Sequence, residues 1–146
     1  MTARTRLDGD ELIAIRDLQA DVDLVWLAFT TPQHLAAFWG GHHATVRPGS
    51  VSVDLRVGGG FELETRGADG TSRRLRFRYD VVEPPTRLSM LEPLTGITTD
   101  IRFEPTSTGT RVVVNQRRLP PELQTEHAAT GLAGILDRLD TALQTI

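Results

Sequence analysis

Histidine is the residue type that most readily combines proton transfer with metal binding, and the chain contains four: His34, His42, His43 and His127. A metal site needs two or three protein ligands that converge on one point. His42 and His43 are adjacent, so in an extended segment their side chains point in opposite directions. No acid–histidine pair at helical i, i+4 spacing accompanies them. The spacing therefore predicts no metal site, and no cofactor is expected.

Hydroxyl and carboxylate side chains form no catalytic pattern either. The sequence contains no Gly-x-Ser-x-Gly motif, and it has no cysteine that could act as a nucleophile. The carboxylates fall on the polar side of the predicted strands, where a solvated sheet face is expected: Asp54, Glu62, Glu64, Asp80, Asp100 and Glu104. Gly58-Gly59-Gly60 is followed by neither a lysine nor a helix, so it indicates a turn rather than a phosphate-binding loop. No catalytic residue is predicted.

One dense basic segment interleaves arginines with two aromatic residues: Arg73, Arg74, Arg76, Phe77, Arg78 and Tyr79. Such interleaving is typical of single-stranded nucleic-acid binding, but period-two alternation places the arginines and the aromatic rings on opposite faces of a strand. The expected hairpin register places Glu62 opposite Arg76. It also places Glu64 opposite Arg74. Together with a net charge of -3, this pattern indicates an exposed, ion-paired outer face, and no nucleic-acid partner is predicted.

The length and composition of the chain indicate what kind of domain positions these residues. The chain has 146 residues, of which 39% are hydrophobic and 24% charged, which is typical of one globular domain. We expect a mobile N-terminal tail over residues 1–10 and a single domain over residues 11–146. The sequence contains no run long enough for a membrane span and no apolar segment of a signal peptide, so the predicted location is the cytoplasm.

The periodicity predicts a strand, two short helices, six further strands and a long helix. The first strand covers residues 11–20 and carries Ile13, Ile15 and Leu18. The two short helices follow Asp21 and Thr31. The six strands are expected over residues 51–57, 61–66, 74–81, 87–92, 97–103 and 111–118, and the long amphipathic helix over residues 121–145. Short turns between strands predict an antiparallel sheet, so the fold class is α+β, with a seven-stranded sheet curled around the C-terminal helix.

Five local motifs, in this order and spacing, resemble a known family. They are Val25-Trp26, Thr31-Pro32 to Phe38-Trp39, residues 54–59 (DLRVGG), residues 82–88 (VEPPTRL) and residues 109–112 (GTRV). Over residues 11–143 the chain is similar to the SRPBCC (START-like, helix-grip) superfamily, in the branch like the activator of heat-shock-protein ATPase. The resemblance implies a helix-grip fold with a hydrophobic cavity between helix and sheet.

The chain departs from that branch at two places that should border the cavity. Gly131-Leu132 stands where the branch usually carries Gly-Trp, and residues 115–118 (NQRR) stand where a histidine-containing segment is common. We expect Leu132 to keep the packing role of the tryptophan while leaving more room for a ligand.

The resemblance and the inward strand positions together predict the residues that line the cavity. Tyr79 and Gln116 are the two polar groups of this set and would orient a ligand, and His42 and His43 are expected as polar groups at the pocket mouth. The predicted ligand-binding residues are Trp39, Phe61, Phe77, Tyr79, Met90, Ile101, Phe103, Val114, Gln116, Leu132 and Leu136.

The favoured function is non-covalent binding of a small, mostly hydrophobic molecule such as a lipid. Two alternatives stay open: a cyclase- or dehydratase-type enzyme acting on a polyketide-like substrate, and a chaperone-accessory interaction domain. Binding is favoured over catalysis because the chain offers few acid–base groups for the cavity. A chaperone partner is not expected, since the chain has no additional N-terminal domain to dock one. A homodimer remains open.

Overall fold

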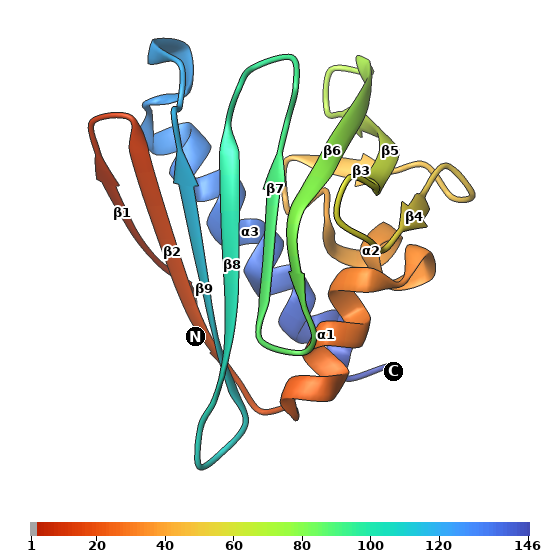
Figure 1. Ribbon diagram of the computed structural model, residues 1–146. Coiled ribbons are helices and arrows are strands. Elements are labelled where there is room, and N and C mark those ends of the chain that lie inside the picture. Colours follow the sequence, from red (N-terminus) through yellow and green to blue (C-terminus); the bar gives the residue numbers. More distant parts are fainter. Residues whose placement is uncertain (1–2) are drawn as a thin grey trace.

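The computed structural model describes residues 3–146 as a curved antiparallel sheet with one long helix across its concave face (Figure 1). The strands are β1 (Arg4–Asp8), β2 (Glu11–Leu18), β3 (Ala44–Val46), β4 (Ser52–Asp54), β5 (Gly60–Gly67), β6 (Ser72–Glu83), β7 (Arg87–Leu91), β8 (Thr98–Pro105) and β9 (Thr110–Arg117). The helices are α1 (Val22–Thr30), α2 (Pro32–Phe38), a 3₁₀ turn η1 (Pro121–Leu123) and α3 (Glu126–Leu143).

The sheet has nine strands, in the order β1-β2-β9-β8-β7-β6-β5-β3, with β4 also paired to β5. The expected α+β architecture is confirmed, but the expected count of seven strands is too low because β1 and β3 were not predicted. The predicted strand over residues 51–57 shortens to β4. Leu55 and Val57 lie beyond it and are 39% and 63% exposed, so their alternation with polar residues does not reflect burial.

The predicted tail over residues 1–10 is corrected by strand β1. Arg4–Asp8 pair antiparallel with β2, and Leu7 lies opposite the buried Leu12 on the face toward α3. Thr5 and Leu7 thus extend the inner surface, while Arg4 and Arg6 keep this edge strand charged, which disfavours pairing with another chain. Met1 and Thr2, also part of the predicted tail, lie outside the described residues.

Helix α3 closes the concave side of the sheet. Leu132, Leu136 and Leu139 on α3 are 8%, 0% and 0% exposed and pack in one cluster with the inner row of the sheet. The helix begins at Glu126 rather than near residue 121, because Pro120 is extended, residues 121–123 form η1, and the Thr125 side chain accepts a hydrogen bond from the Ala128 amide. Thr125 is therefore the N-cap. No helix within residues 3–146 is long and apolar enough to span a membrane.

Candidate ligand-binding site

Three of the four arginines in the basic segment form salt bridges with carboxylates on the outer face of strands β5 and β6. Arg74 and Arg76 both bind the Glu62 carboxylate, with N–O distances of 2.7 and 3.1 Å, and Arg78 lies 3.5 Å from Asp80. The predicted register is confirmed: Glu62 lies opposite Arg76 and Glu64 opposite Arg74. The Arg74 guanidinium beside Glu62 lowers the pKa of that carboxyl, consistent with a stable exposed ion pair.

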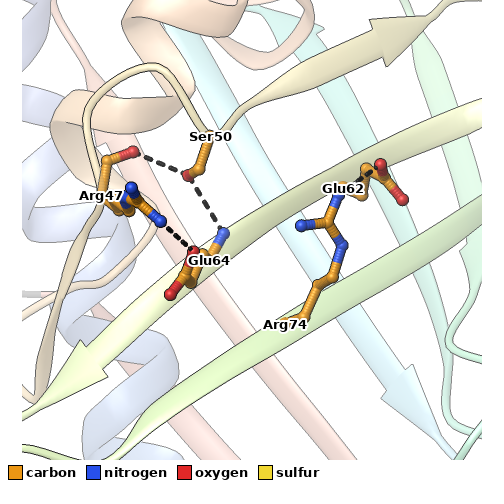
Figure 2. Close-up of polar contacts among 5 residues, drawn as sticks. All are labelled: Arg47, Ser50, Glu62, Glu64 and Arg74. Carbon is orange, nitrogen blue, oxygen red and sulfur yellow. Dashed lines mark hydrogen bonds and ion pairs between the residues drawn. The ribbon is translucent and has the colours of Figure 1, made fainter.

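Glu64 makes its contacts with the segment after β3 instead of with Arg74 (Figure 2). Its carboxylate binds the Arg47 guanidinium at 3.1 Å, and its backbone amide donates to the Ser50 hydroxyl, also at 3.1 Å. The Ser50 hydroxyl in turn donates to the Arg47 carbonyl at 2.7 Å. Register alone predicts which residues face each other, but the length and flexibility of the side chains decide which charges meet.

A cleft of about 770 Å³ opens on the other side of this hairpin, between its inner face and α3. The segment that follows α2 forms its third wall. The lining combines a cluster of nitrogen-bearing side chains at the mouth with an apolar back wall. The lining includes Trp39, His42, His43, Arg73, Leu75, His127 and Ile135.

Glycines on α3 bring the two adjacent histidines against the helix. A Cβ atom at Gly131 would lie 3.2 Å from His43 Nδ1, and one at Gly134 would lie 3.0 Å from His42 Cδ2. The absence of side chains at these two positions therefore allows both imidazoles to approach the helix. His43 also stacks on His127 of α3, with ring centroids 4.3 Å apart and an interplanar angle of 8°. The structure thus places His42 and His43 together in the cleft lining.

Arg73 occupies the same inner row of β6 as the aromatic residues, contrary to the expectation that arginines and aromatics face opposite sides. It lies opposite Thr65, which is 8% exposed, while Arg74 lies opposite Glu64 on the outer face. Arg73 and Leu75 are two positions apart, and residues two apart in a strand lie on the same face. Within residues 3–146, Arg73 forms no salt bridge.

Most of the predicted ligand-binding residues are packed in the core behind this cleft. Trp39 lines the cleft directly and forms its inner boundary, since its ring packs edge-on against Phe61 and Phe77 at centroid distances of 5.1 and 5.6 Å. Phe61 and Phe77 also border a second cleft of about 380 Å³ between β4 and β6. The residues Tyr79, Met90, Ile101, Phe103 and Leu136 are at most 1% exposed, Val114 is 2% exposed and Leu132 is 8% exposed.

The two predicted polar orienting groups occupy different environments. The Tyr79 hydroxyl is buried and has no hydrogen-bond partner within the described part of the chain, and burial raises the pKa of this phenol. Gln116 is half-buried on the same face of the sheet, opposite Thr99, but β7 and β8 separate its strand from that of Tyr79. The structure therefore does not bring the two groups together.

Sequence reasoning missed a buried ion pair that ties the sheet to α3. Arg16 of β2 is 7% exposed, and its Nη1 and Nη2 atoms bind Asp137 at 2.6 Å and Asp140 at 3.0 Å. The inner row of β2 is Leu12, Ala14, Arg16 and Leu18, so Ile13 and Ile15 face the opposite side. Two features of the sequence could have predicted this pair. Arg16 is four positions after Leu12 and so lies on the same face of the strand, and the predicted helix carries two aspartates three positions apart.

The described residues contain no group of three or more histidine or carboxylate side chains arranged to hold a metal ion.

Comparisons with known proteins agree with this architecture. A protein from Nitrosomonas europaea is 24% identical, covers 95% of this chain and 97% of its own, and superposes with a TM-score of 0.82. For a protein from Rhodobacter sphaeroides the identity is 22%, both chains are covered completely, and the TM-score is 0.83. An AHSA1-like protein from Aeromonas hydrophila has 24% identity over 92% of each chain and a TM-score of 0.77. At these identities the structures establish the fold alone.

No curated protein matches the chain significantly. The family model described as "Activator of Hsp90 ATPase homolog 1-like protein" matches residues 19–144. This match confirms the resemblance inferred from the local motifs. Because it spans most of the sequence, from the end of β2 to the end of α3, the chain belongs to the Activator of Hsp90 ATPase homolog 1-like protein family.

Proposed function

We propose that this protein binds a small, mostly hydrophobic molecule between α3 and the inner face of the sheet, and that the ligand enters through the His42–His43–His127 cleft. The observation that carries the proposal is the shape and lining of that cleft. Its volume of about 770 Å³ falls within the usual range for small-molecule sites. Its back wall includes the half-buried Leu75, Ile135 and Trp39 side chains, which give an apolar ligand a surface to cover.

The unpartnered Tyr79 hydroxyl supports a deeper position for part of the ligand. A buried hydroxyl without a partner costs roughly 1–3 kcal/mol, a cost that a ligand acceptor would remove. Trp39 contacts Phe61 and Phe77, and Phe61 in turn lies 6.1 Å from the Tyr79 ring, centroid to centroid. A ligand that displaces the Trp39 ring would therefore come close to this hydroxyl.

The same hydroxyl is suited to donate a hydrogen bond to a ligand and not to act as a base. Burial raises the pKa of Tyr79, so its proton is retained at physiological pH and the group donates a hydrogen bond instead of acting as a base. A cyclase or dehydratase would need a base other than Tyr79, and the imidazoles of the cleft lining are the groups of that kind near the ligand.

Titration with N-phenyl-1-naphthylamine, an uncharged apolar dye whose fluorescence rises on leaving water, tests the proposal. The wild-type protein should bind it saturably. Ile135→Trp fills the cleft with an indole and should weaken binding about tenfold or more, because the dye loses the back wall. Thr141→Trp is the matched control, since Thr141 is exposed on α3 and lies outside the cleft lining.

Thermal unfolding verifies that both variants are folded. The proposal is refuted if the wild-type protein does not bind the dye, or if folded Ile135→Trp binds it as well as Thr141→Trp does.

A further inference from the structure

The inner row of β6 places a cation in the cleft lining, followed along the strand by apolar and aromatic side chains. From the mouth inward the row runs Arg73, Leu75, Phe77 and Tyr79, with Arg73 and Leu75 in the cleft lining and Tyr79 fully buried. At about 3.3 Å per residue, the row spans roughly 20 Å. A ligand lying along it would meet a charge at one end and hydrocarbon along its length.

We infer that the ligand of this cleft is an amphipathic monoanion, with a carboxylate-type head bound by Arg73 and an apolar body against Leu75, Ile135 and Trp39. This inference rests on the proposed function and specifies the chemical class of its ligand.

Arg73 differs from its neighbours in lacking a carboxylate partner. Arg74 and Arg76 share Glu62 on the outer face, whereas Arg73 forms no salt bridge to any residue of the range 3–146. An arginine fork that is not already paired matches the planar geometry of a carboxylate. Of the four arginines on β6, Arg73 is thus the one without a salt bridge within residues 3–146, and it lies in the cleft lining.

Asp69 is the acidic residue in the cleft lining, and its carboxylate is already engaged. Its Oδ1 atom accepts the Thr71 amide at 2.9 Å within the turn between β5 and β6. That hydrogen bond is the main cause of the lowered pKa of Asp69, and the charge of Arg73 contributes less. Asp69 therefore shapes the turn and, among the described residues, forms no salt bridge with Arg73.

The stacked imidazoles of His43 and His127 provide further donors beside Arg73 in the same lining. Each neutral imidazole carries one N–H group that can donate to an oxyanion. His127 also lies in the first turn of α3, an 18-residue helix, whose N-terminal end favours negative charge. Three elements, β6, the segment after α2, and the start of α3, thus present donors or positive potential toward one opening.

Displacement of N-phenyl-1-naphthylamine by chain-matched competitors tests the inference. The competitors are dodecanoate, dodecanol and dodecyltrimethylammonium. The two ionic compounds are used below their critical micelle concentrations and dodecanol below its solubility limit. We expect dodecanoate to bind about tenfold more tightly than dodecanol, as one charge-assisted contact at a partly exposed site would give. The cation should bind most weakly, and the preference for dodecanoate should shrink in high salt.

Arg73→Gln should abolish the preference for dodecanoate over dodecanol. Arg74→Gln removes the same charge one position along the strand, on the outer face, and should keep the preference. Equal affinity of wild-type protein for dodecanoate and dodecanol overturns the inference while the binding function stands. An equal loss in both variants overturns the assignment to Arg73, because only net charge would then matter.

Calorimetry with dodecanoate alone separates this inference from the proposed function. If the dye and dodecanol fail to bind but dodecanoate binds in an Arg73-dependent manner, the anion site stands and the apolar binding function fails. If none of these probes binds, both are refuted.

Discussion

Replacing Arg16 by methionine should destabilise the protein substantially, because it leaves Asp137 without its guanidinium. The Asp137 side chain is 18% exposed, and its Oδ1 atom lies 2.6 Å from Arg16 Nη1. Methionine keeps much of the apolar stem of arginine, so the lost charge dominates over lost packing.

Removing one partner of a buried ion pair typically costs about 3–5 kcal/mol. Asp137 retains a hydrogen bond from the Ala3 amide at 2.9 Å and some contact with solvent, so we expect a loss of about 2–3 kcal/mol for Arg16→Met. Asp140→Asn is the graded comparison. Asp140 lies 3.0 Å from Arg16 Nη2 and is 35% exposed, and a pair so open to solvent contributes about 1 kcal/mol or less.

Urea denaturation followed by circular dichroism measures both variants, with an unchanged m-value as the sign that only native-state stability has changed. A loss below about 0.5 kcal/mol for Arg16→Met, which is within the range of ordinary surface substitutions, would show that the ion pair does not hold β2 against α3. An Asp140→Asn variant that loses as much as Arg16→Met would refute the dependence on burial.

Three further predictions concern the core, the helix and the outer face. Tyr79→Phe removes a buried hydroxyl that lacks a partner, so the ligand-free protein should gain about 1 kcal/mol in thermal or urea unfolding, and a loss would reveal a bound partner. Gly134→Ala should destabilise, since its Cβ would lie 3.1 Å from a loop backbone nitrogen, whereas Gly131→Ala meets only a side chain and should be neutral or stabilising in the same assay. The lowered pKa of Glu62 means that its ion pair stabilises at neutral pH and loses this effect as the pH falls through the folded-state pKa. NMR titration should show the Glu62 midpoint rising in Arg74→Gln, and an unchanged midpoint would contradict the cause given.

Local patterns in the sequence were sufficient to predict most of the architecture. The turn at Gly67–Gly70 specifies the β5–β6 register, because a short hairpin loop leaves few ways to pair its strands. The spacing of Leu132, Leu136 and Leu139 predicts the stripe of α3 that the sheet covers. These features depend on residues close together in the chain, so periodicity and turn chemistry determine them.

Contacts between distant segments could not be derived in the same way. Strand alternation places Arg16 and Arg73 on the inner rows of their strands. It does not predict that aspartates 121 and 124 residues later bind Arg16. Nor does it reveal that Arg73 meets no carboxylate within the described residues. Whether an inward arginine becomes a structural ion pair or a free cation depends on which side chain the opposing element presents.

The histidines illustrate the same division between sequence and structure. Adjacent residues in a strand point to opposite sides, so the sequence predicted that the His42 and His43 side chains would point away from each other. They lie instead in a turn after Gly41, whose φ of +59° bends the chain toward α3. Both rings then reach the helix where Gly131 and Gly134 leave room for them. The sequence by itself determined seven of the nine strands, the long helix and the face of that helix that packs on the sheet. The cleft arose only from tertiary packing, because its walls come from residues 39–44, 65–75 and 127–135, which no local rule connects.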